Sequence, residues 1–84
     1  MPLSIRVAFY KRTNGPGTLE VAYHDPRARD RIVDETSAWN ATFKLAMTVP
    51  LTELVARGIV GPKTAAHWEQ RCALRGAVRA YGIA

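Results

Sequence analysis

The 84-residue sequence contains a single cysteine and only two histidines, which leaves little material for metal or disulfide chemistry. A lone Cys72 forbids an internal disulfide, and a structural zinc site needs a cluster of Cys and His residues that this chain lacks. No order of Ser, His and Asp typical of a hydrolase occurs, and no Gly-rich loop is followed by the Lys-Ser/Thr of a phosphate loop. We therefore expect no enzymatic activity, no cofactor, no metal and no small-molecule substrate.

Long apolar runs and an export signal are also missing. No apolar run approaches the ~18 residues that span a bilayer. The N-terminus does not show the basic, apolar and small-residue order of a signal peptide. Because 48% of the residues are hydrophobic, a disordered chain is not expected. We predict one small cytoplasmic domain over residues 1–84, with no membrane partner.

Positive charge is what the sequence has in excess, with a net charge of +5. The excess lies near the C-terminus, where residues 62–84 carry four Lys and Arg against one Glu. Residues 26–40 are neutral by comparison, with three Arg against three carboxylates. A concentrated basic segment attracts nucleic acid or an acidic protein surface.

The first part of the chain shows the alternation typical of strands. Apolar residues alternate over 3–10 and again over 18–24, and a turn rich in Gly and Pro separates the two runs. This pattern predicts an antiparallel β-hairpin over 3–24 with one apolar face. Its edge near Ile5–Phe9 could pair with a second copy to form a homodimer. Residues 42–49 alternate as well, which favours a third strand over a helix.

A helix is predicted over residues 26–39. Asp25 is suited to cap it, and Pro26 is suited to its first position. Arginines and carboxylates in this segment stand three or four residues apart, so the basic cluster is expected to neutralise itself on a solvated face. The pairs concerned are Arg27–Asp30, Arg31–Asp34 and Arg31–Glu35.

Two further helices are predicted after the third strand. The first covers residues 50–57, with Gly58 placed to end it and Ile59 placed to pack back on it. The second covers residues 62–80 and contains Gly76, which could end the helix, kink it or allow close packing. The predicted fold class is therefore α+β, with an N-terminal hairpin, three-stranded if residues 42–49 pair with it, packed on one face against about three helices.

The last predicted helix carries basic residues at four-residue spacing, so that they neighbour one another on its surface. They are Lys63, His67, Arg71, Arg75 and Arg79. Trp68 and Cys72 fall in an apolar stripe of the same helix, which is the pattern of a core contact. The alternative interpretation leaves Trp68 exposed between arginines as a stacking platform for a base.

Residues 51–71 read LTELVARGIVGPKTAAHWEQR. The segments Glu53-Leu54, Gly58-Ile59, Pro62-Lys63-Thr64 and Trp68-Glu69 resemble the helix-turn-helix that opens DNA-binding domains of the MerR and excisionase type. The resemblance implies that residues 63–75 enter the major groove. Lys63 and Thr64 would lie near the leading end, with His67 and Arg71 one and two turns later.

The expected function is non-enzymatic binding, in which the C-terminal basic helix contacts nucleic acid. The candidate residues are Lys63, Thr64, His67, Arg71, Arg75 and Arg79, with Lys11 and Arg12 beside the hairpin tip as a second site. The alternative is an inhibitor that binds an acidic or nucleic-acid-binding surface of a protein partner. In small size and lack of catalytic motifs the chain is similar to phage-encoded inhibitors such as anti-CRISPR proteins.

Overall fold

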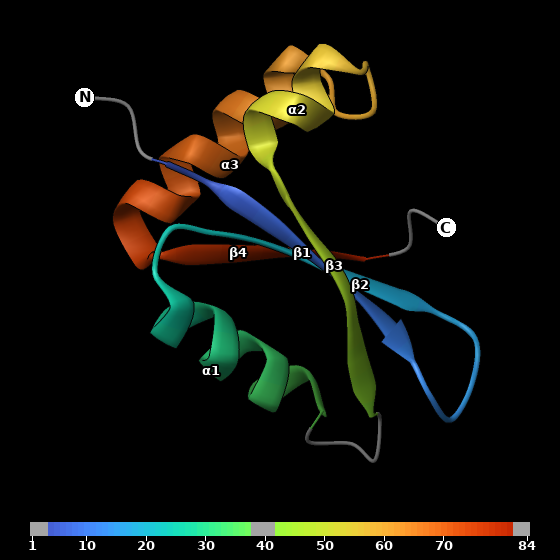
Figure 1. The fold of residues 1–84 in the computed structure, drawn as a ribbon. Coiled ribbons are helices and arrows are strands. Elements are labelled where there is room, and N and C mark those ends of the chain that lie inside the picture. Colours follow the sequence, from blue (N-terminus) through green and yellow to red (C-terminus); the bar gives the residue numbers. More distant parts are fainter. Residues whose placement is uncertain (1–3, 38–41, 82–84) are drawn as a thin grey trace.

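The computed structural model of the chain describes residues 4–37 and 42–81. Its strands are β1 (Arg6–Arg12), β2 (Thr18–Tyr23), β3 (Phe43–Pro50) and β4 (Ala77–Tyr81). Its helices are α1 (Pro26–Thr36), α2 (Leu51–Ala56) and α3 (Pro62–Arg75). The strands form one antiparallel sheet in the order β3-β1-β2-β4 (Figure 1). The predicted α+β fold class is confirmed.

The hairpin and the third strand are both present. β1 pairs with β2 from Arg6–Tyr23 to Lys11–Thr18, and the backbone N–H of Arg12 donates to the carbonyl of Gly17 at 3.1 Å to close the turn. β3 pairs with the other side of β1, so the strand interpretation of residues 42–49 is confirmed. Because β3 covers that side, the edge near Ile5–Phe9 is not open, and the dimer contact predicted there is wrong.

Helices cover both faces of the sheet, which corrects the prediction of helices on one face. α2 and α3 lie on one side of the strands and α1 lies on the other (Figure 1). Val7 and Ala8 are neighbours in β1 and both are fully buried, one in each of the two cores. The prediction of a hairpin with one apolar face is therefore wrong, because Ala8 and Tyr10, on the face opposite Val7, are buried with α1 in the second core.

α1 begins as predicted. The carboxylate of Asp25 accepts a hydrogen bond from the backbone N–H of Arg27 at 3.0 Å, and Pro26 occupies the first turn. The helix ends at Thr36, and Trp39, which was included in the predicted helix, lies outside the described residues.

The ion pairs predicted along α1 do not form within 4 Å in the described part of the chain. Arg29 pairs instead with its neighbour Asp30 at 3.0 Å. Its guanidinium also lies 4.8 Å from the centroid of the Tyr23 ring, beneath α1. Spacing on a helix allows a pair, but contacts with the sheet determine which arginine makes one.

α2 ends at Ala56, one residue before the predicted limit, and Gly58 follows in the predicted left-handed conformation with a φ of +73°. Ile59 does not pack back on the helix, because 57% of it is exposed. Val60, which is 7% exposed, joins the core in its place.

α3 is anchored by its apolar stripe. Trp68 is 5% exposed and Cys72 is fully buried, so the core interpretation is confirmed and the stacking-platform interpretation of Trp68 is wrong. The Cys72 Sγ–H donates to the carbonyl of Ala22 at 3.3 Å, and burial raises the pKa of the thiol to about 11. A buried, protonated thiol of this kind is chemically inert.

α3 ends at Gly76, so the predicted helix over residues 62–80 is wrong beyond Arg75. Gly76 adopts a left-handed φ of +85°, and its carbonyl accepts the N–H groups of His24 at 3.0 Å and Asp25 at 3.2 Å. Ala and Arg after the glycine favour helix by propensity. Pairing of β4 with β2, together with burial of Ala77, outweighs that local preference.

We expect Gly76→Ala to lower the free energy of unfolding far more than Gly58→Ala. Both positions require a left-handed conformation, which costs a non-glycine residue about 1–2 kcal/mol. At Gly76 a Cβ would also meet the Cβ of Ala28 at 2.9 Å, which adds an overpacking cost of about 1–3 kcal/mol, whereas space beside Gly58 is open. Urea denaturation of both variants measures the difference, and equal losses would contradict the close packing at Gly76.

Candidate functional site

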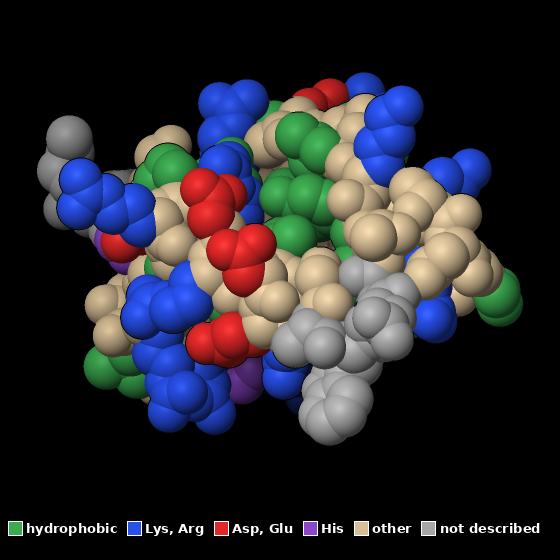
Figure 2. Space-filling view, turned by 90° about the horizontal axis from the view of Figure 1, so that it is seen from below, with side chains coloured by type: hydrophobic (Ala, Val, Ile, Leu, Met, Phe, Trp, Pro, Cys, Tyr) green, Lys and Arg blue, Asp and Glu red, His purple; other side chains and the backbone are tan. Residues whose placement is uncertain are grey.

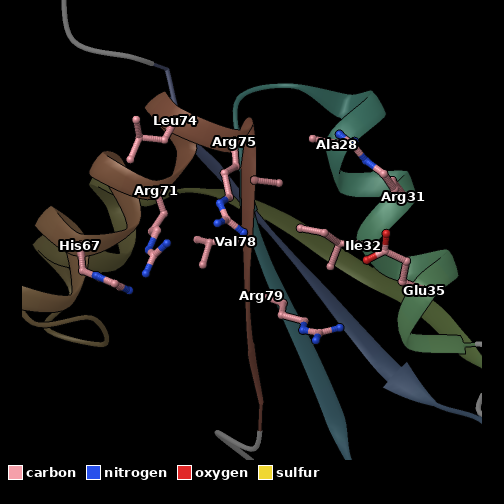
Figure 3. Close-up of a pocket in the computed structure, with 11 residues that line it drawn as sticks. Ala28, Arg31, Ile32, Glu35, His67, Arg71, Leu74, Arg75, Val78 and Arg79 are labelled. Carbon is pink, nitrogen blue, oxygen red and sulfur yellow. The ribbon is translucent and has the colours of Figure 1, made fainter.

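A cleft with a volume of about 680 Å³ runs along the outer edge of the sheet at β4, between α1 and α3 (Figure 3). Each of these three elements contributes a basic side chain to its lining. The basic residues are Arg31 from α1, His67, Arg71 and Arg75 from α3, and Arg79 from β4. Glu35 from α1 is the one carboxylate among the lining residues, so the cleft is strongly cationic.

The core contacts of α3 aim its basic side into the cleft. Trp68 and Cys72 are held in the core, so residues on the other side of the helix face away from that core. Arg71 and Arg75 are one turn apart, and both point from α3 toward β4 (Figure 3). Leu74, which is 75% exposed, comes from the same helix and adds an apolar surface to the lining.

Arg79 reaches the same cleft from β4. Its Nη1 donates to the Thr36 Oγ1 at 3.1 Å, and that hydroxyl donates to the carbonyl of Ile32 at 2.7 Å. Arg79 is therefore held against the end of α1, and the prediction that it continues the helical row of α3 is wrong. It lines the same cleft as Arg71 and Arg75, but its side chain points toward α1 (Figure 3).

Three of the cleft arginines lack an ionic partner in the described part of the chain. Arg31, Arg71 and Arg75 form no ion pair within 4 Å; the pairs that do form are Arg29–Asp30 and Arg57–Glu53. The outer surface of α1 differs, because there acidic side chains lie among the basic ones (Figure 2). Arg31, Arg71 and Arg75 thus keep N–H donors available for an anion.

The remaining predicted residues lie outside the cleft. Lys63 and Thr64 are exposed at the start of α3 but do not line it. Lys11 and Arg12 lie on the hairpin, where the Arg12 Nε donates to the Asn14 Oδ1 at 3.1 Å and so braces its own turn. The structure does not bring these two pairs together with Arg71 and Arg75.

Sequence analysis missed two parts of the cleft. Arg31 was assigned to a self-neutralised helix face, and β4 was assigned to the end of a helix. The excess of Arg over acidic residues near Gly76 was the signal that indicated the α3 and β4 arginines of the cleft. No local signal indicated that Arg31, forty residues earlier than Arg71, would face it.

Other chemistry finds no support in the described residues. They contain no group of three or more His, Cys, Asp and Glu residues placed to hold a metal ion. Within residues 4–37 and 42–81, no helix has the length and apolar character needed to cross a membrane. No protein-family model, curated protein or solved structure matches the chain.

Glu20 is a carboxylate buried outside the cleft. It lies in β2 opposite Phe9 of β1 and Ala80 of β4, and only 6% of it is exposed. Burial raises the pKa of this carboxyl above its ordinary value of 4.5, because the charged form loses solvation.

We expect Glu20→Gln to stabilise the protein at neutral pH and to have little effect at low pH. Because the folded-state pKa is raised, the native state binds the Glu20 proton more tightly than the unfolded state does. The stability gained from that proton is fully present below pH 4.5 and is lost as pH rises through the folded-state pKa. Urea denaturation of both proteins at pH 4 and pH 7 measures the effect. If the difference in free energy of unfolding between Glu20→Gln and the parent does not grow from pH 4 to pH 7, the prediction is wrong.

Proposed function

We propose that this protein is a non-enzymatic binding protein that holds an acidic segment of a protein partner in the cleft between α1 and α3. One observation carries the proposal: arginines from α1, α3 and β4 line a single groove, and within the described residues Arg31, Arg71 and Arg75 make no ion pair. Guanidinium groups pair with carboxylates through two parallel hydrogen bonds, so such a groove suits Asp and Glu side chains.

The shape of the groove favours a protein segment over a nucleic-acid duplex. The basic side of α3 is turned toward β4 and α1, whereas a helix that reads duplex DNA must enter a major groove about 12 Å wide. The lining also contains the apolar side chains of Ile32, Leu74 and Val78. Apolar contacts of this kind suit the side chains of a peptide better than a phosphate backbone.

Nucleic acid is the second candidate partner. The net charge of +5 and the exposed Lys63 and Thr64 at the start of α3 favour it. The resemblance of residues 51–71 to a helix-turn-helix favours it too, since α2 and α3 are consecutive helices joined by residues 57–61. In this mode α3 would meet phosphates, and affinity would fall steeply with salt, with a slope of about −0.9 for each phosphate neutralised on a duplex.

A cytoplasmic location is part of the same proposal. Cys72 is a free thiol, which is compatible with a reducing compartment. An inhibitor-like protein that acts on an intracellular partner would fit both the binding site and that location.

The test is direct binding by fluorescence anisotropy over a salt series. The probes are polyglutamate, duplex DNA, single-stranded DNA and RNA. We expect polyglutamate to bind and the double variant Arg71→Glu with Arg75→Glu to weaken that binding about tenfold or more, which corresponds to about 1.4 kcal/mol. Lys44→Glu with Arg57→Glu makes the same change in net charge on exposed residues outside the cleft, and it should have a much smaller effect.

The probes separate the two candidates. Binding of DNA or RNA that exceeds binding of polyglutamate, and that depends on Arg71 and Arg75, would replace the first candidate with the second. If both double variants lose the same amount of affinity, net charge alone drives binding and the cleft is not the site.

A further inference from the structure

We infer that two copies of this chain associate through β3, which pairs antiparallel with β3 of the second copy about a two-fold axis at Leu45. The inference concerns the sheet edge opposite the cleft and does not rest on the proposed function. In the sheet formed by residues 4–37 and 42–81, no strand lies beyond β3. The middle of β3 is exposed, and its Leu45 and Met47 are 50% and 58% exposed.

Two hydrogen bonds determine which backbone groups of β3 face outward. The N–H of Thr13 donates to the carbonyl of Thr42, directly opposite, at 2.8 Å. At the other end, the N–H of Leu51 donates to the carbonyl of Ile5 at 2.9 Å. Along an antiparallel pair, residues whose groups face the partner strand alternate with residues whose groups face away. Counted from the two ends, the residues with outward N–H and C=O groups are Phe43, Leu45 and Thr48.

A third hydrogen bond supports this assignment from the other side of β1. The N–H of Arg12 donates to the carbonyl of Gly17 at 3.1 Å, so the backbone groups of Arg12 face β2 and not Phe43, which lies opposite in β3. The described part of the chain offers the outward groups of β3 no hydrogen-bond partner. The same alternation applies to the next two pairs, which are Tyr10–Leu45 and Ala8–Thr48.

The bulge in β3 makes these outward groups evenly spaced. Ala46 has no partner in β1, so the step from Leu45 to Thr48 spans two residues of β1, as does the step from Phe43 to Leu45. The series is therefore symmetric about Leu45, and a rotation by 180° places donors opposite acceptors. Leu45 then pairs with Leu45 of the second copy, and Phe43 pairs with Thr48. This self-complementarity identifies the occupant of the edge as a second copy.

The side chains of β3 fit the same arrangement. Opposite residues in an antiparallel pair share a face of the sheet, and Tyr10 belongs to the core beside α1, so Leu45 lies on the α1 face. Pairing with its counterpart removes the exposed part of Leu45 from water. Lys44 is the one charged residue of β3, and the two-fold axis at Leu45 does not place it opposite itself. Like charges are therefore not directly opposed across the pair.

The dimer and the cleft use different parts of the molecule. No residue of β3 lines the cleft, which lies at the β4 edge. An eight-stranded sheet joined through β3 would carry one cationic cleft at each end. Each copy has a net charge of +5, so added salt should favour association by screening the repulsion between copies. Binding of an anion in the cleft should instead weaken with salt.

Analytical ultracentrifugation of the intact protein measures the association. Over roughly 10 μM to 1 mM, the range suited to a short interface, we expect a monomer–dimer equilibrium that shifts toward dimer as salt rises. Leu45→Lys removes the apolar contact and places two cations directly opposite, so it should weaken the dimer about tenfold or more. The control is Ile59→Lys at a residue that is 57% exposed outside β3, and it should have a much smaller effect. A chain that stays monomeric over this range, or equal effects of the two variants, would overturn the inference.

Cysteine cross-linking tests the position of the two-fold axis. Directly opposite residues that exchange hydrogen bonds have Cα atoms about 5.5 Å apart, which a disulfide can span. Mild oxidation should therefore convert Leu45→Cys to a covalent dimer, while the buried Cys72 stays reduced. Met47→Cys changes an equally exposed residue of the same strand that lies off the axis, so it should cross-link far more slowly. Equal rates for the two variants, or faster cross-linking of Met47→Cys, would contradict pairing about Leu45.

Discussion

The left-handed turn at Gly76 is the constraint on which the rest of the structure depends. It ends α3, and its carbonyl accepts hydrogen bonds from His24 and Asp25 at the start of α1. The position where a Cβ would stand is 2.9 Å from the Cβ of Ala28 in α1, so the close approach of the two helices needs a glycine. One residue thereby sets the end of α3, the start of α1 and the path of β4, and the cleft is the space between them.

Stability and binding draw on different parts of the molecule. Burial on both faces of β1 and β2 holds the fold together, with Trp68 and Cys72 in one core and Ala28 in the other. Arg31, Arg71 and Arg75 contribute little to that stability, because they make no ion pair among the residues that the structure describes. They line one cleft, so an anionic partner bound there would reduce the repulsion between them.

The alternation of residues 3–10, 18–24 and 42–49 was sufficient to predict three of the four strands, because period-two patterns are local. The apolar stripe of Trp68 and Cys72 likewise predicted the buried side of α3, and with it the exposed side that carries Arg71 and Arg75. Prediction failed where a local preference competed with a tertiary contact. After Gly76, alanine and arginine favour helix, and only the unpaired edge of β2 supplies the reason to form a strand.

Local sequence patterns were enough to predict the fold class, the limits of most helices and strands, and the excess of positive charge near α3. These follow from periodicity, capping residues and composition, which act over a few residues. The three-dimensional fold was needed to show that α1 lies across the sheet from α3, and that Arg31 and Arg79 line the same cleft as Arg71 and Arg75. That arrangement depends on contacts between residues far apart in the chain. The local spacing predicted ion pairs for Arg31 and a helix at Arg79, but burial and strand pairing outweigh these local preferences.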